Sequence, residues 1–69
     1  MTQNDKVLRH LLDYGTITPL EALQEYGIMR LGARIYELKR MGYVISRTMT
    51  EGKNRYGEIT RFARYHAEF

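Results

Sequence analysis

Cationic side chains recur at close spacing in the middle of the chain, on a segment that the sequence predicts to be helical. Arg30, Arg34, Lys39 and Arg40 lie between residues 29 and 41, where apolar residues recur at helical spacing. Such side chains pair with phosphate oxygens, and arginine also matches the two acceptors on the major-groove edge of guanine. This segment is therefore the first candidate for a site that binds a polyanion.

The distribution of charge along the chain agrees with that interpretation. The 69 residues carry a formal net charge of +3, but the excess is not uniform. Residues 28–64 contain nine basic and three acidic residues, whereas residues 1–27 contain two basic and four acidic residues. This asymmetry indicates a basic face that attracts polyanions. The alternative is a solvated surface on which one sign is locally in excess.

Two shorter helices are predicted before the cationic segment. Thr2 or Asn4 can cap a first helix that runs to about Tyr14. The run Thr18-Pro19-Leu20-Glu21 combines a capping threonine, a proline at the first helical position and a glutamate three residues after the cap. It is the clearest helix start in the sequence. This second helix runs to about Glu25, and a tight turn follows.

The third helix is predicted over residues 29–41, with Leu31, Ile35 and Leu38 on its buried face. Gly32 inside this helix costs roughly 1 kcal/mol relative to alanine. Either another backbone approaches there closely, or the glycine is tolerated. The opposite face and its flanks carry Met29, Arg30, Ala33, Arg34, Tyr36, Glu37, Lys39 and Arg40.

A β-hairpin is predicted after the third helix. Residues 43–49 have strand character, residues 50–54 have the composition of a turn, and residues 55–65 form the return strand. The hairpin tip is basic and contains a glycine. The residues expected in the core are Leu8, Leu11, Leu12, Leu20, Leu23, Ile28, Leu31, Ile35, Leu38, Ile45 and Ile59.

The order helix, short strand, helix, turn, helix, hairpin is that of a winged helix. The run TPLEALQEYGIMRLGARIYELKRMGYVI resembles the small helix-turn-helix proteins common in phages and prophages, in which a T-P-x-E-A helix start leads to an R-I-x-x-L-K/R-x-x-G-Y-x-I run. The ending FARYHAEF resembles the closing aromatic strand of that family. The resemblance extends from Thr16 to about Tyr65. It implies an α+β winged helix-turn-helix fold and DNA binding. The length of 69 residues allows a single domain, residues 1–69.

On this interpretation the helix over residues 29–41 enters the major groove of double-stranded DNA, and the hairpin lies alongside as a basic wing at residues 50–55. Tyr36 and Glu37 each have an alternative to contact with DNA. Tyr36 can pack at the edge of the core, and Glu37 can form an ion pair with Arg34, Arg40 or another neighbour. Arg40 is also favourable near a helix C-terminus for structural reasons. The expected DNA-binding residues are Arg30, Ala33, Arg34, Tyr36, Glu37, Lys39, Arg40, Lys53, Asn54 and Arg55.

Two roles follow from these features. The first is a sequence-preferring DNA-binding protein that acts as a transcriptional regulator or an excisionase-like architectural factor. The alternative is a winged-helix protein-interaction module that binds or inhibits a host protein without DNA, through a surface with Met29, Tyr36 and Phe62. We also expect the protein to pair with itself, using the first helix or the closing strand with Phe62 and Phe69.

Other classes of function find little support in the sequence. His10 and His66 are far apart, there is no cysteine, and a zinc site needs three or four ligands. No arrangement of nucleophile and base is recognisable, so we expect no catalytic activity, no cofactor and no small-molecule substrate. No apolar run approaches the ~20 residues that span a bilayer. We therefore expect a cytoplasmic protein with no membrane partner.

Overall fold

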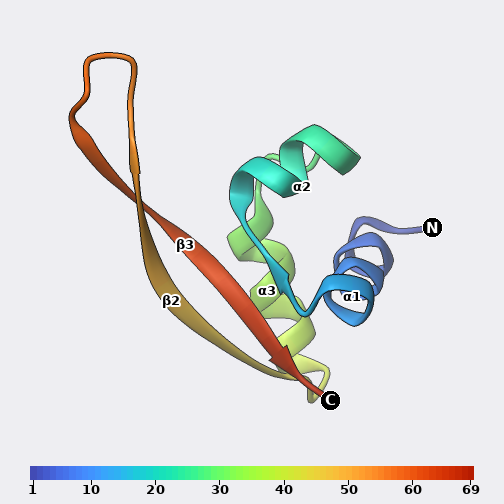
Figure 1. Cartoon of the computed structure of the whole chain (residues 1–69). Coiled ribbons are helices and arrows are strands. Elements are labelled where there is room, and N and C mark those ends of the chain that lie inside the picture. Colours follow the sequence, from blue (N-terminus) through green and yellow to red (C-terminus); the bar gives the residue numbers. More distant parts are fainter.

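The computed structural model describes the whole chain, residues 1–69. The elements are α1 (Gln3–Tyr14), β1 (Thr16–Ile17), α2 (Pro19–Tyr26), α3 (Leu31–Arg40), β2 (Val44–Lys53) and β3 (Ile59–Glu68). The three strands form an antiparallel sheet in which β3 is central and β1 and β2 are the edges. The helices lie on one side of the β2–β3 hairpin, whose tip extends away from them (Figure 1).

The first two helices begin and end as their sequences predict. Each starts with a capping box, formed by Thr2 with Asp5 in α1 and by Thr18 with Glu21 in α2. Each ends at a glycine in the left-handed region, where a side chain would be strained, and α1 ends at Gly15 with a φ of 82°. The cap of α1 is Thr2 rather than Asn4, and α2 extends one residue beyond the predicted end.

Helix α3 is shorter than predicted. It spans Leu31–Arg40 rather than residues 29–41. Gly27 ends α2 in the left-handed conformation, and Ile28 then inserts into the core with 1% of its surface exposed. The chain therefore needs further residues before a new helix begins. Arg30 occupies the N-cap position with a non-helical ψ of 61°. At the other end, Met41 is the C-cap.

The turn of the hairpin lies at residues 54–58, and the prediction of a turn at residues 50–54 is wrong. Gly52 has the composition of a turn residue but lies within β2. A Cβ atom added at Gly52 would lie 3.2 Å from Cε1 of Phe62, so the glycine makes room for the aromatic ring of the opposite strand. The true turn is closed by Asn54 and by Gly57, whose φ is 77°.

The core lies where α1, α2 and α3 meet the base of the sheet. Its buried hydrophobic residues are Val7, Leu11, Ile17, Ala22, Ile28, Leu31, Ile35, Leu38 and Ile45, with Leu8, Tyr26, Tyr43, Tyr65 and Ala67 partly buried against them. The prediction was wrong for Leu12, Leu20, Leu23 and Ile59, which are exposed. The eight residues of α2 bury only Ala22, and Ile59 is the first residue of β3, directly after the hairpin tip.

A polar contact also joins α1 to α2. His10 has only 4% of its surface exposed, and its Nδ1 atom lies 2.6 Å from the hydroxyl of Tyr26. The ring of Tyr14 lies over His10 with a centroid distance of 4.6 Å. Burial raises the pKa of the Tyr26 hydroxyl, and the nearby Glu25 carboxylate acts in the same direction. This contact joins α1 to the end of α2.

Candidate nucleic-acid interface

The exposed face of α3 carries a cluster of cationic and aromatic side chains. Tyr36, Lys39 and Arg40 are exposed, and the guanidinium carbon of Arg40 lies 5.9 Å from the centre of the Tyr36 ring. Ala33 is half-buried on the same helix. The structure therefore leaves Tyr36 free to contact a ligand, while the stacked guanidinium of Arg40 remains at the surface.

The start of α3 differs from the starts of α1 and α2. No side chain hydrogen-bonds to its first backbone amides, whereas both other helices have a capping box. The exposed Arg30 stands at this uncapped end. Free amides and the helix dipole favour an anion at a helix N-terminus, and Arg30 adds a full positive charge there.

Arg34 and Glu37 are engaged with other protein groups. Arg34 donates through Nη1 to the Oε1 atom of Gln3 at 3.0 Å, and its Nη2 atom lies 2.6 Å from the Glu37 carboxylate. The pair connects α3 to the start of α1. Glu37 thus forms the ion pair that the sequence offered as an alternative. Arg34 therefore lies on the side of α3 that faces α1.

The tip of the hairpin presents Lys53 and Arg55 on either side of a structural asparagine. The Asn54 side-chain oxygen accepts hydrogen bonds from the amides of Tyr56, at 2.9 Å, and Glu58, at 3.0 Å. Its amide group also donates to the Glu58 carboxylate at 3.1 Å. Asn54 therefore shapes the tip, and the exposed cations next to it are the groups available to a ligand.

The ion pairs of the protein leave most of these cations unpaired. The three pairs are Arg9 with Asp13, Arg34 with Glu37, and Arg61 with Glu51. Among the residues expected to bind DNA, five cations form no ion pair. They are Arg30, Lys39, Arg40, Lys53 and Arg55. Their charge is therefore not neutralised locally, and it remains available to an external polyanion.

Arg47 and Tyr65 were not predicted as site residues, and they lie directly opposite each other on β2 and β3. Together with Gly32, Tyr36 and Lys39 they line a cleft of about 360 Å³ between α3 and the hairpin. The signal was present in the strand pattern. Arg47 alternates in phase with the buried Ile45, so it had to lie on the face that packs toward α3.

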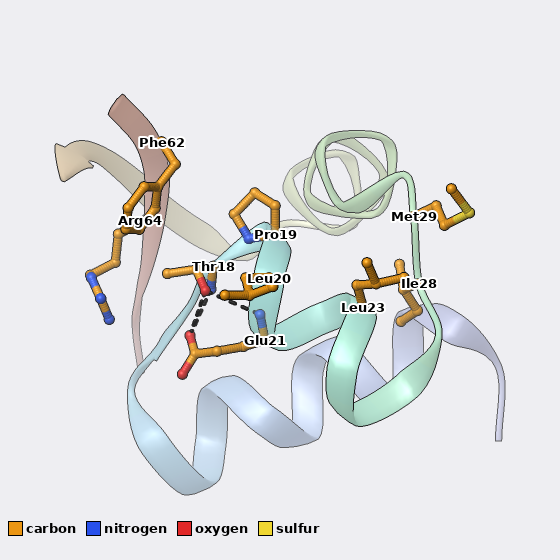
Figure 2. A pocket seen from close by; sticks show the side chains of 9 residues that line it. All are labelled: Thr18, Pro19, Leu20, Glu21, Leu23, Ile28, Met29, Phe62 and Arg64. Atoms are coloured by element: carbon orange, nitrogen blue, oxygen red, sulfur yellow. Dashed lines mark hydrogen bonds between the residues drawn. The ribbon is translucent and has the colours of Figure 1, made fainter. Parts of the chain in front are cut away.

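A second, larger hollow lies on another side of the hairpin and is mostly apolar. It has a volume of about 600 Å³ and is lined by residues of α2, the turn after it and β3. Figure 2 shows Pro19, Leu20, Leu23 and Met29 around this groove, with Phe62 on the strand opposite. Leu20, Leu23 and Met29 are exposed, so they are available for contact with another molecule.

Taken together, α2, the turn and α3 form a helix-turn-helix, and the hairpin that follows α3 forms its wing. The fold and the cationic helix define a winged helix-turn-helix protein, as the sequence predicts. The chain belongs to the winged helix-turn-helix domain family, whose model matches residues 2–67. Membership suggests DNA binding as the general function, and domains of this kind are typically not enzymes. No curated protein and no solved structure matches the chain.

Two further findings concern other kinds of site. The structure contains no group of three or more histidine, cysteine, aspartate or glutamate side chains placed to hold a metal ion. None of the helices combines the length and the apolar character needed to cross a membrane.

Proposed function

We propose that the protein binds double-stranded DNA with a preference for sequence, with α3 in the major groove and the hairpin tip on the flanking backbone. The observation that carries the proposal is the set of five unpaired cations on α3 and the tip. The ten residues of α3 give a helix about 15 Å long. A helix of this kind fits the major groove, where base edges are distinguishable.

The individual contacts follow from what surrounds each side chain. Arg30 is the main candidate for a base contact, because it is exposed and unpaired at the start of α3. Lys39, Arg40, Lys53 and Arg55 are candidates for phosphate contacts. Tyr36 is exposed enough to reach a thymine methyl group or a phosphate, and Ala33 leaves room beside it. Arg34, Glu37 and Asn54 serve the interface mainly by holding α3 and the tip in place.

We further propose a role in transcription regulation or as an excisionase-like architectural factor of phage or prophage type, in the cytoplasm. The T-P-x-E-A start and the R-I-x-x-L-K run support this proposal through their resemblance to small phage helix-turn-helix proteins. A single module of this size buries about 600–1,000 Å² of protein surface on DNA. Because that is little for a selective regulator, we propose that two copies bind together.

Selection from random duplexes at fixed salt tests the proposal. We expect enrichment of a motif, and a palindromic motif would indicate a symmetric pair of copies. Replacing Arg30 with alanine should then reduce discrimination at one position of each half-site, by about 1–3 kcal/mol per contact. Arg9→Ala is the matched control, because it removes the same charge from α1, where Arg9 pairs with Asp13. A pool without enrichment would contradict sequence-preferring binding.

The apolar groove favours a second candidate function, a protein-interaction module that binds a host protein without DNA. Six of its lining residues are Pro19, Leu20, Leu23, Ile28, Met29 and Phe62. Apolar and aromatic side chains that cluster in a concave surface are typical of protein interfaces. Met29→Ser should abolish such an interaction but leave the binding of one copy to a duplex with a single half-site unchanged. Loss of duplex binding in this variant would instead place the groove in the DNA interface.

A further inference from the structure

The cleft between α3 and the hairpin differs in composition from the apolar groove. The walls of the cleft are formed by Ile35, by the two tyrosine rings and by the aliphatic parts of the lysine and arginine side chains. The charged groups of these two cations lie at its surface. Its lining residues are Gly32, Ile35, Tyr36, Lys39, Arg47 and Tyr65, and no carboxylate is among them. The volume of about 360 Å³ exceeds what one phosphate group occupies, so a phosphate and its attached sugars have room to enter.

The two cations of this cleft are free to bind an anion. Neither Lys39 nor Arg47 takes part in any of the three ion pairs of the protein. The nearest acidic residue of α3 in sequence is Glu37, which is paired with Arg34. Arginine and lysine without a local counter-charge, on low-dielectric walls, give a site of positive potential.

A hydroxyl group adds a third donor. The Tyr65 oxygen lies 3.8 Å from the position that a Cβ atom of Gly32 would occupy, so it reaches the surface of α3. None of the side-chain hydrogen bonds within the protein uses this hydroxyl. Because Gly32 has no side chain, an anion can approach the hydroxyl along the helix. Arg47 stands directly opposite Tyr65 in the strand register.

We propose that this cleft binds one phosphate of the DNA backbone, with Lys39 and Arg47 as the cations and the Tyr65 hydroxyl as a hydrogen-bond donor. The inference rests on the proposed function, because it assumes that α3 occupies the major groove. A strand that borders the groove then passes between α3 and the wing, where the cleft lies. Arg47 and Tyr65 thereby connect the contacts of α3 to those of the hairpin tip.

Titration of a selected duplex at several salt concentrations tests the two residues that the cleft adds. Arg47→Ala should weaken binding about tenfold, as expected for the loss of one charge-assisted hydrogen bond. It should also lower the slope of log affinity against log salt by about 0.9. Tyr65→Phe should weaken binding several-fold with an unchanged slope. Arg9→Ala and Tyr14→Phe are the matched controls on α1, and both should bind like the wild type.

A duplex with a single uncharged methylphosphonate in place of one phosphate locates the contact. Scanning this substitution along the site should reveal one position in each half-site that weakens binding of the wild type but has little further effect on Arg47→Ala. The inference is overturned if Arg47→Ala and Tyr65→Phe bind DNA as tightly as the wild type and the scan reveals no such phosphate position. The proposed function is unaffected by that result, because the wild type still binds DNA. Failure of the wild type to bind any duplex would overturn the proposed function itself.

The same chemistry also fits a free phosphate compound, which a second measurement separates from DNA. Inorganic phosphate and a mononucleotide are titrated while the amide resonance of Gly32 is followed by NMR. We expect that each compound shifts the Gly32 resonance only weakly, even at millimolar concentration. At micromolar concentration, neither compound should displace the duplex from the protein. The assignment to DNA is overturned if the mononucleotide saturates the shift of the Gly32 resonance at micromolar concentration while the duplex does not shift it. The cleft would then be a small-molecule site.

Discussion

At the scale of single residues, the surroundings of each arginine decide what it does. Arg34 and Arg40 lie on the same helix, but Arg34 is held by Gln3 and Glu37, whereas Arg40 lies against the exposed Tyr36 ring. The sequence identified both as cations of the third helix and predicted the ion-pair alternative for Glu37. It did not distinguish the two arginines, because the bond from Arg34 to Gln3 joins residues 31 positions apart. Long-range contacts of this kind leave no local pattern.

Gly32 gives a prediction in which stability and binding change in opposite directions. A Cβ atom there would meet only the Tyr65 hydroxyl, at an ordinary contact distance of 3.8 Å. Gly32→Ala should therefore raise the free energy of unfolding by about 0.4–1 kcal/mol, because it restricts the unfolded chain. DNA affinity should fall, since the methyl group narrows the approach to the cleft. Urea unfolding and duplex titration of the same sample measure both effects, and a loss of stability would contradict the open environment of Gly32.

Asp5 gives a prediction about pH. Its carboxylate accepts a hydrogen bond from the backbone amide of Thr2, and this bond, with the Thr2 side chain, holds the pKa of Asp5 below its ordinary value of 3.8. A carboxyl whose pKa is lowered in the folded state stabilises the fold above its ordinary pKa. This stabilisation is lost as the pH falls through the folded pKa.

Thermal unfolding between pH 2 and pH 7 measures this effect, with Asp5→Asn as the comparison. The wild type should be more stable than Asp5→Asn near neutral pH, and the difference in melting temperature should shrink as the pH falls below about 4. A constant difference across the whole range would show that the charge of Asp5 does not stabilise α1.

At the scale of elements, local signals were sufficient for helices and insufficient for the hairpin. The capping box of Thr18 and Glu21 predicted the start of α2, and the ends of α1 and α2 were predicted to within a residue. The cap of α1 was left open between Thr2 and Asn4, and the structure shows Thr2. The hairpin turn was misplaced because Gly52 and its neighbours have the composition of a turn. Their true state depends on the Phe62 ring packing over Gly52 from the opposite strand. Leu12, Leu20 and Leu23 were predicted in the core but are exposed. Hydrophobic periodicity shows which residues share a helix face, but it does not show how much of that face packs against the core.

The packing of α3 can be tested with two leucines of different exposure. Leu38 is 1% exposed, whereas Leu12 is 55% exposed. Leu38→Ala should lower the free energy of unfolding by about 2–5 kcal/mol, because it leaves a cavity under α3. Leu12→Ala should cost less than about 1 kcal/mol. Urea unfolding followed by circular dichroism measures both, and a Leu38→Ala variant as stable as the wild type would contradict the orientation of α3.

At the scale of the whole molecule, one small domain presents two different surfaces. The cations of α3 and of the hairpin tip form the proposed DNA interface, and the apolar groove with Phe62 lies on another side of the hairpin. The winged helix-turn-helix fold was predictable from the order of elements, and the winged helix-turn-helix family from the resemblance of the T-P-x-E-A and R-I-x-x-L-K runs. The groove was not, because it forms only when α2, the turn and β3 come together.

Self-association is a property of the whole molecule, and we expect it at least on DNA. Phe62 lies in the groove, whereas Phe69 contacts Tyr43 with a centroid distance of 6.4 Å at the end of β3. The two rings are therefore not one continuous patch, and we expect the Phe62 side to form the contact between copies. Sedimentation with and without a selected duplex measures the stoichiometry. A strict one-to-one complex on a site without a repeat would refute the pairing.

The salt dependence of duplex binding tests the central claim most directly. If Arg30, Lys39, Arg40, Lys53 and Arg55 neutralise phosphates or contact bases, affinity must fall steeply with salt, by roughly 0.9 log units per log unit of salt for each phosphate. Replacing Lys53 and Arg55 together should lower the slope by roughly 1.8 and weaken all sequences alike. A slope near zero for the wild type would contradict DNA binding through this face and favour the protein-interaction module.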